Sequence, residues 1–186
     1  MTCIIGLVKK DTVWIGGDSA GTASNMHQRV RADKKVFIRG EFIFGFCGSF
    51  RMGQLLQYTL KLPKQPSSKS DFKYLVNEFI DSVRDCLMAE NKKAESKKDD
   101  ELYPNFLFGY RGLLYGVQGD YQVSKPVEGF DAVGSGADIA MGAMHASMKV
   151  GDPKKRITAA LEASARNNAA VRPPFHILSL KNGRAR

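Results

Sequence analysis

The sequence has 186 residues, of which 43% are hydrophobic and 25% charged, and its formal net charge is +9. This size and composition are typical of a compact globular protein with a substantial core, and they exclude disordered and fibrous proteins. The longest apolar run, Phe42 to Cys47, is too short to span a bilayer. The first residues lack the pattern of a secretory signal. We therefore expect one domain, residues 1–186, in a soluble cytoplasmic protein without membrane contact.

The positive charge does not by itself predict nucleic-acid binding. Lys and Arg are scattered along the chain, and the densest cluster, residues 91–101, alternates with Glu and Asp. No recognition-helix, zinc-finger or aromatic-basic signature accompanies them. The three cysteines, Cys3, Cys47 and Cys86, have no metal-ligand spacing and form no even disulfide set. We expect reduced buried thiols, no cofactor, no metal and no nucleic-acid partner.

The first part of the chain predicts strands and turns. Residues 2–8 and 13–15 are apolar and rich in β-branched side chains, and a polar turn joins them. Residues 36–38 and 42–44 flank Arg39-Gly40-Glu41 in a second candidate hairpin. These runs are apolar on both faces, which is typical of strands in a sheet that is covered on both sides.

Two helices are predicted next. The first covers about residues 50–60 and is ended by the prolines that follow, Pro63 and Pro66. The second has apolar residues at steps of three and four from Phe72 to Leu87, with Ser70 as its expected N-cap. It leads into the charged segment 91–101, which we expect to be a solvated helix end or loop.

The second half repeats this order of strands followed by helices. We expect strands at 106–110, 113–117 and 121–123, helices over 138–150 and from Asp152-Pro153 onward, and a closing strand at 175–180. Helices that arrive in pairs after strand hairpins do not fit the alternation of a parallel doubly wound sheet. They favour an α+β protein in which two antiparallel sheets pack together between helix pairs, a four-layer αββα sandwich.

Thr2 is the first candidate for chemistry. Removal of Met1 before a small residue would leave a threonine whose hydroxyl is a nucleophile and whose own α-amine can accept the proton. The reference pKa of an α-amine is about 7.7–8.0, so this base is partly neutral near physiological pH. Many proteins begin Met-Thr, so the pattern has meaning only if further site residues accompany it.

Further candidates lie at the predicted ends of strands. Gly17 and Asp18 end the second strand, and Lys34-Lys35-Val36 begins the third. A lysine near the nucleophile would lower the pKa of its hydroxyl and amine, and an aspartate would orient that lysine. Gly48, after the fourth strand, offers a backbone N–H to a developing oxyanion. Ser135, in Gly134-Ser135-Gly136, offers a hydroxyl to the same amine.

Taken together, these motifs carry a resemblance. In their order and spacing they resemble proteasome β-subunits, and most closely the bacterial HslV-type threonine peptidase. The motifs are Met-Thr before an apolar strand, Gly-Gly-Asp, Lys-Lys-Val, Gly-Phe-Cys-Gly-Ser and Val-Gly-Ser-Gly. The resemblance covers nearly the whole chain. It implies an N-terminal nucleophile hydrolase of the proteasome type, assembly into a homo-oligomeric ring around a chamber, polypeptide substrates and an ATP-dependent unfoldase partner.

The resemblance also implies the role of each site residue. Thr2 becomes the nucleophile, Asp18 and Lys35 the supporting charge pair, Gly48 the oxyanion donor and Ser135 the hydroxyl that orients the amine. Lys35 is preferred to Lys34 because the family lysine directly precedes an apolar β-branched residue. An aspartate of the family, in the loop before the last strand, is replaced here; alignment on Phe175-His176 puts the uncharged Asn167 in its place.

Two alternatives to a threonine-type endopeptidase stay open at this point. One is a catalytically inactive ring-forming structural or interaction protein of the same fold, which the loss of the family aspartate favours. The other is hydrolysis of a small amide, a reaction of other N-terminal nucleophile enzymes, for which the sequence offers no substrate-binding motif. Any ATP would be used by a separate partner, because the chain has no Gly-Lys-Ser/Thr phosphate loop.

Overall fold

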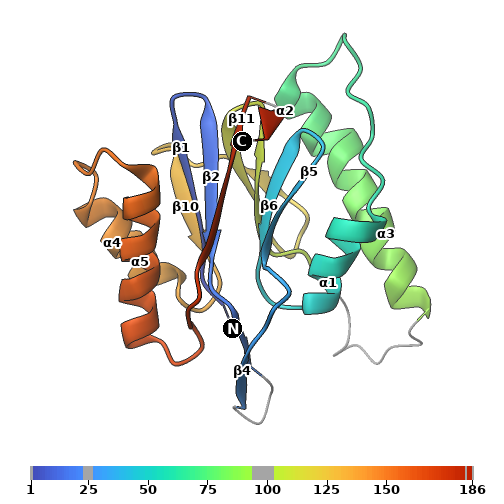
Figure 1. Ribbon diagram of the computed structural model, residues 1–186. Helices are drawn as coiled ribbons and strands as arrows, with labels where there is room; N and C mark the ends of the chain where they lie inside the picture. The colour runs from blue at the N-terminus through green and yellow to red at the C-terminus, as the bar shows by residue number, and fades with distance from the viewer. Residues whose placement is uncertain (1, 23–26, 94–102, 183, 186) are drawn as a thin grey trace. The chain divides into compact units, whose positions relative to one another are not determined.

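The computed structural model describes residues 2–22, 27–93, 103–182 and 184–185 (Figure 1). They group into two compact units. Unit 1 comprises Met1–Gly48, Asn105–Gly116 and Lys125–Arg186, and unit 2 comprises Ser49–Pro104 and Val117–Ser124. The single domain expected from the sequence stays a prediction. Within the described ranges, no helix combines the length and apolar character that crossing a bilayer requires.

Unit 1 is built on two antiparallel sheets. The first has the strand order β10-β1-β2-β11-β12, with bounds Phe130–Val133, Ile4–Lys9, Thr12–Gly17, His176–Lys181 and Arg184–Ala185. The second runs β5-β6-β7-β8, with bounds Val36–Arg39, Phe42–Phe46, Phe106–Tyr110 and Leu113–Val117. A short hairpin, β3 (Ala20–Thr22) and β4 (Gln28–Val30), extends from the end of β2.

The strands of the first sheet are buried on both faces, as their composition predicts. One face contributes Ile4, Val13 and Ile15 to a core that also contains Val36 and Ile43 of the second sheet. The opposite face places other side chains under the helices α4 (Ala137–Ala146) and α5 (Pro153–Asn167), which cover that side of the sheet (Figure 1). Unit 1 therefore contains a helix layer and two sheet layers of the predicted sandwich.

Unit 2 contains the first helical region. Helix α1 (Phe50–Gln54) continues into the π-helix η1 (Leu55–Thr59), and α2 (Asp71–Tyr74) continues through η2 (Leu75–Phe79) into α3 (Ile80–Lys93). These two continuous helices are those predicted from the apolar period, although Phe72 and Val76 are 48% and 37% exposed. Strand β9 covers only Val123–Ser124. Most of the charged segment 91–101 lies outside the described residues.

Several elements depart from the sequence predictions. The strands β3, β4, β10 and β12 were not predicted, because they are short and lack a continuous apolar run. Helix α4 ends at Ala146 and not near Val150, because hydrogen-bonded turns at His145–Met148 and Ser147–Val150 replace further helical bonds. Helix α5 begins as predicted: the Asp152 carboxylate accepts the N–H groups of Lys154 and Lys155 at 2.8 and 3.1 Å.

Candidate active site

Three side chains from separate strands meet at one end of unit 1. Thr2 directly precedes the β1 region, Asp18 follows β2, and Lys35 precedes β5. The Lys35 ammonium donates to Thr2 Oγ1 and to Asp18 Oδ1, each at 2.8 Å. All three residues are buried, with exposed fractions of 2%, 1% and 2% for Thr2, Asp18 and Lys35. The fold thus brings a threonine hydroxyl into direct contact with a buried ion pair.

Asp18 is held by four donors. Its Oδ1 accepts the Cys3 N–H at 3.0 Å in addition to Lys35, and its Oδ2 accepts the N–H groups of Ala20 at 2.8 Å and Arg172 at 3.3 Å. These four donors fix the orientation of the carboxylate in its buried position. The carboxylate therefore connects the chain start, the end of β2 and the segment before β11.

Lys35, preferred to Lys34 from the sequence, is the lysine that contacts Thr2 Oγ1. Lys34 is exposed. Burial lowers the pKa of the Lys35 ammonium from its ordinary value, and the charge of Asp18 opposes this shift. Glycine at position 17 leaves room for Ile4, since a Cβ there would lie 2.7 Å from Ile4 Cδ1.

The backbone nitrogen of Thr2 faces the turn after β10. It donates to Ser135 Oγ at 3.2 Å, and the Ser135 hydroxyl contacts Thr2 O at 3.4 Å. The Gly136 N–H also donates to Thr2 O, at 3.1 Å. Gly134 has a φ of +100°, and a Cβ there would lie 2.3 Å from Thr2 O. Glycine at this position lets the turn approach the chain start.

Gly48 lies just after β6 and is exposed, with a φ of +84° that favours glycine. None of the described residues accepts its backbone N–H. Its neighbour Cys47 lies beside the turn after β10, because a Cβ on Gly134 would be 3.4 Å from Cys47 Cβ. The free N–H of Gly48 is therefore available to a bound group at this end of unit 1.

Asn167 does not reach this site. It is the last residue of α5, is exposed, and donates its amide to the Ala163 carbonyl at 2.9 Å. The adjacent Asn168 contacts the site instead: its Nδ2 donates to Ser135 O at 2.7 Å, and its Oδ1 accepts the Ala170 N–H at 2.9 Å. Asn167 therefore lies outside this hydrogen-bond network, because α5 continues through it.

Sequence reasoning also missed the segment that follows. The Ser19 N–H donates to Arg172 O at 2.9 Å, and the Ser19 hydroxyl donates to Pro174 O at 2.6 Å. These bonds and the bond from Arg172 N to Asp18 attach residues 172–174 to the site. A signal was present at Asn168, since asparagine commonly accepts the N–H two residues on. No sequence pattern marked Arg172, which contacts Asp18 and Ser19 through its backbone, or Ser19, which uses both its backbone N–H and its hydroxyl.

Two buried thiols, Cys3 and Cys47, lie near the site. Burial raises the pKa of Cys3 to about 11 and that of Cys47 to about 12. Cys3 Sγ contacts Ser164 Oγ at 3.6 Å, on the side of the sheet that faces α5. The described residues also contain no group of three or more His, Cys, Asp and Glu placed to hold a metal ion. The candidate chemistry rests on Thr2, Lys35 and Asp18.

No family model matches the sequence, and no curated protein matches it. Solved structures do match. BPH of Thiobacillus denitrificans in complex with epoxomicin is 20% identical, with a TM-score of 0.77 over 97% of this chain and 99% of that chain. HslV of Trypanosoma brucei is 19% identical, with a TM-score of 0.68 over 97% and 99%. The chain has the HslV-like, proteasome-type fold.

A third solved structure is similar over the whole of this chain. The Anbu (Gly-1) mutant from Hyphomicrobium sp. strain MC1 is 12% identical, with a TM-score of 0.75 over 100% of this chain and 85% of that chain. The α+β sandwich fold predicted from the sequence is confirmed. At these identities the likeness concerns the fold, and the chemistry must be argued from the site residues.

Proposed function

We propose that the chain is a threonine-type peptidase in which Thr2, exposed as the first residue by removal of Met1, attacks peptide bonds. The observation that carries this proposal is the 2.8 Å contact between the Lys35 ammonium and Thr2 Oγ1, with Asp18 on the other side of that ammonium. A buried positive charge beside a hydroxyl lowers its pKa and stabilises the developing alkoxide.

The proposed base is the α-amine of Thr2. The nitrogen that now donates to Ser135 Oγ at 3.2 Å would become this amine once Met1 is removed. Met1 itself lies outside the described residues. The nearby Lys35 ammonium disfavours protonation of the amine, so the neutral amine that can accept a proton is favoured. The Ser135 hydroxyl would hold the amine toward the reacting hydroxyl.

The proposed reaction has two halves. The Thr2 hydroxyl attacks the substrate carbonyl carbon and its proton passes to the amine, while the Gly48 N–H stabilises the oxyanion. The carbon–nitrogen bond then breaks, the leaving amine takes the proton, and an ester to Thr2 remains. Water, deprotonated by the same amine, attacks the ester and releases the second product. No cofactor takes part.

The proposal includes the assembly that the resemblance implies. We propose a homo-oligomeric ring that encloses the Thr2 sites, polypeptide substrates, an ATP-dependent unfoldase partner and a cytoplasmic location. Enclosure would restrict cleavage to chains that have been unfolded and admitted. A particle much heavier than 20.5 kDa by light scattering is the expected result, and a monomer at working concentration would contradict this part of the proposal.

One observation favours the second candidate, an inactive ring-forming protein. The neutral amide of Asn168 lies beside Ser135, and the family aspartate is replaced in this sequence by the equally uncharged Asn167. An amide can keep the hydrogen bond to Ser135 O but adds no negative charge near the amine. An Asn168→Asp variant distinguishes the two candidates: it should change the pH profile of an active enzyme and leave an inactive protein without cleavage.

The decisive experiment is intact mass spectrometry before and after incubation with epoxomicin, whose epoxyketone group reacts with both the hydroxyl and the free amine of an N-terminal threonine. Loss of Met1 and one covalent adduct per chain are expected. Thr2→Ala should abolish adduct and peptide cleavage while the assembly size stays unchanged. Lys34→Met, at the exposed neighbouring lysine, should retain both, whereas Lys35→Met should lose both.

Two outcomes would reject the peptidase. A chain that retains Met1, or a processed chain that forms no adduct and cleaves no peptide, supports the inactive ring-forming protein. Cleavage that persists in Thr2→Ala would reject Thr2 as the nucleophile even if the activity is real.

A further inference from the structure

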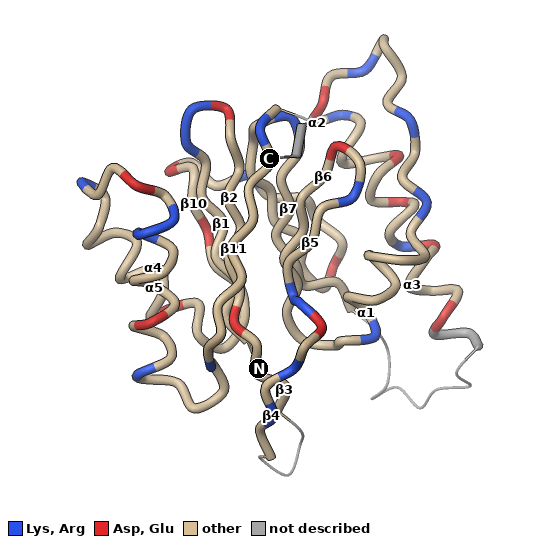
Figure 2. The backbone as a smooth tube through the Cα atoms, viewed as in Figure 1, with Lys and Arg blue, Asp and Glu red and all other residues tan. Residues whose placement is uncertain are grey.

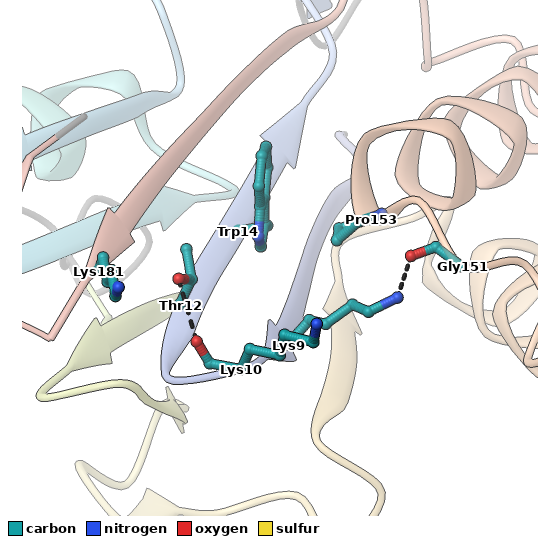
Figure 3. A pocket seen from close by; sticks show the side chains of 7 residues that line it. All are labelled: Lys9, Lys10, Thr12, Trp14, Gly151, Pro153 and Lys181. Carbon is teal, nitrogen blue, oxygen red and sulfur yellow. Dashed lines mark hydrogen bonds between the residues drawn. The ribbon is translucent and has the colours of Figure 1, made fainter.

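A cavity lies in unit 1, at the opposite end of the β1–β2 hairpin from Thr2. Its volume is about 380 Å³. It is lined by three lysines (Lys9, Lys10 and Lys181), by Thr12 and Trp14 of β2, and by Gly151 and Pro153 at the start of α5 (Figure 3). At about 3.3 Å per residue, the seven steps along the chain from Thr2 to Lys9 separate it from the candidate active site by about 23 Å. It is therefore a separate site.

Strand register explains why the lysines converge. Thr12 pairs with Lys9 across β1 and with Lys181 across β11, so the three residues form one row across three strands. Paired residues point to the same face of a sheet, and Trp14, two residues along β2, points to that face as well. The two outer lysines are two strand spacings apart, about 9.5 Å at the backbone. Lys181 therefore lies across β2 from Lys9, whose ammonium turns toward the Gly151 carbonyl and would have to leave it to share one anion with Lys181 (Figure 3).

The charge of the cavity is not neutralised from within. Lys9 donates to the Gly151 carbonyl, whereas no described residue pairs with the ammonium groups of Lys10 or Lys181. The nearest carboxylates in sequence, Asp11 and Asp152, do not line the cavity, and Asp152 is occupied in capping α5. Figure 2 shows basic and acidic positions side by side at the turn between β1 and β2, where Asp11 directly follows Lys9 and Lys10. Three like charges around one hollow favour an anionic occupant.

Trp14 supplies the apolar part of the cavity. Its indole is half-buried and packs on the core beneath α5, and it stands on β2 between Lys181 and Pro153 (Figure 3). Nor does any described residue accept its indole N–H. An indole surface beside ammonium groups is suited to a flat ring that carries negative charge, since the ring can stack while the anion pairs with lysine.

We propose that this cavity binds a nucleoside phosphate. The base would stack on Trp14, and the phosphate groups would pair with Lys9 and Lys181, with Lys10 at the rim. The volume lies within the range of about 300–1,000 Å³ typical of small-molecule sites. The inference does not depend on the proposed peptidase activity, because none of these residues belongs to the candidate active site.

The test uses the full-length protein and its own fluorescence. Trp14 is the one tryptophan of the sequence, so quenching of tryptophan emission reports occupancy of this cavity directly. The titrant is ADP without magnesium, compared with adenosine, which has the ring alone, and pyrophosphate, which has the charge alone. Saturable quenching by ADP is expected, with at least about tenfold weaker binding of adenosine and pyrophosphate.

Two variants distinguish ADP binding in this cavity from a nonspecific effect of the protein's positive charge. Lys181→Gln should weaken ADP binding about tenfold or more, because a charge-assisted contact is lost. Lys155→Gln, which removes the same charge from an exposed residue of α5 that does not line the cavity, should change it less than about twofold. Absence of quenching up to millimolar ADP, equal affinity for ADP and pyrophosphate, or an equal effect of both variants would each overturn the proposal.

Discussion

Replacement of Lys35 by methionine should destabilise the protein, whether or not it is a peptidase. Methionine keeps most of the apolar volume but removes the ammonium that pairs with Asp18 at 2.8 Å. Asp18 is 1% exposed and would be left as a buried charge. Removal of one partner of a buried pair costs about 3–5 kcal/mol. Because three backbone N–H groups still bind the carboxylate, we expect the lower end, about 3 kcal/mol.

The measurement is the free energy of unfolding from urea titration, at matched protein concentration because assembly shifts apparent stability. A loss of about 3 kcal/mol corresponds to a Tm lower by about 6–12 °C in a chain of this size. Lys34→Met, at an exposed lysine, is the control and should change stability by less than about 0.5 kcal/mol.

A double variant tests the cause. Asp18→Asn together with Lys35→Met removes both charges, so it should be less destabilised than Lys35→Met alone, because no unpaired charge remains. The reasoning is refuted if Lys35→Met stays within about 1 kcal/mol of the parent, or if the double variant is as unstable as the sum of the two single variants.

Two further predictions concern other positions. Gly134→Ala should lower the free energy of unfolding by about 3 kcal/mol or more, because its φ is +100° and the new Cβ would meet Thr2 O. Gly142→Ala, in open space on α4, should raise the free energy of unfolding by about 0.5–1 kcal/mol. Thermal unfolding of both variants checks these opposite signs. Iodoacetamide at pH 8 should label the half-buried Cys86 and spare Cys3 and Cys47 in the folded protein, as mass spectrometry can determine. The raised pKa values of Cys3 and Cys47 mean that these thiols lose their protons in the unfolded chain at lower pH than in the folded chain. The free energy of unfolding should therefore fall as the pH rises from about 9 toward 11. This part of the pH dependence should be absent when both thiols are replaced by alanine.

The sequence predicted the main elements because their signals are local. The apolar runs of β1, β2, β5 and β6 are continuous, and this composition correctly predicted strands that are buried on both faces. The apolar period likewise predicted the helix that runs from α2 into α3. Short strands such as β10 were missed, because its four residues acquire strand structure by pairing with β1 and not from their own composition.

For the candidate site, the order of motifs at strand ends indicated Thr2, Asp18, Lys35, Gly48 and Ser135 before any distance was known. Each motif follows or precedes a strand, so the antiparallel order alone predicts that they gather at one end. Their catalytic roles stay predictions, but the contacts among Thr2, Lys35 and Asp18 agree with the expected arrangement.

Only the tertiary structure showed the contacts that depend on where α5 ends and on how the strands pair. The choice between Asn167 and Asn168 depends on where α5 ends, and only the folded chain places the Asn168 amide on Ser135. The same holds for Lys9 and Lys181, which are 172 positions apart in sequence and become neighbours of Thr12 through strand pairing. Periodicity and composition are local properties of the chain, whereas these contacts follow from how distant strands align, which no single segment encodes.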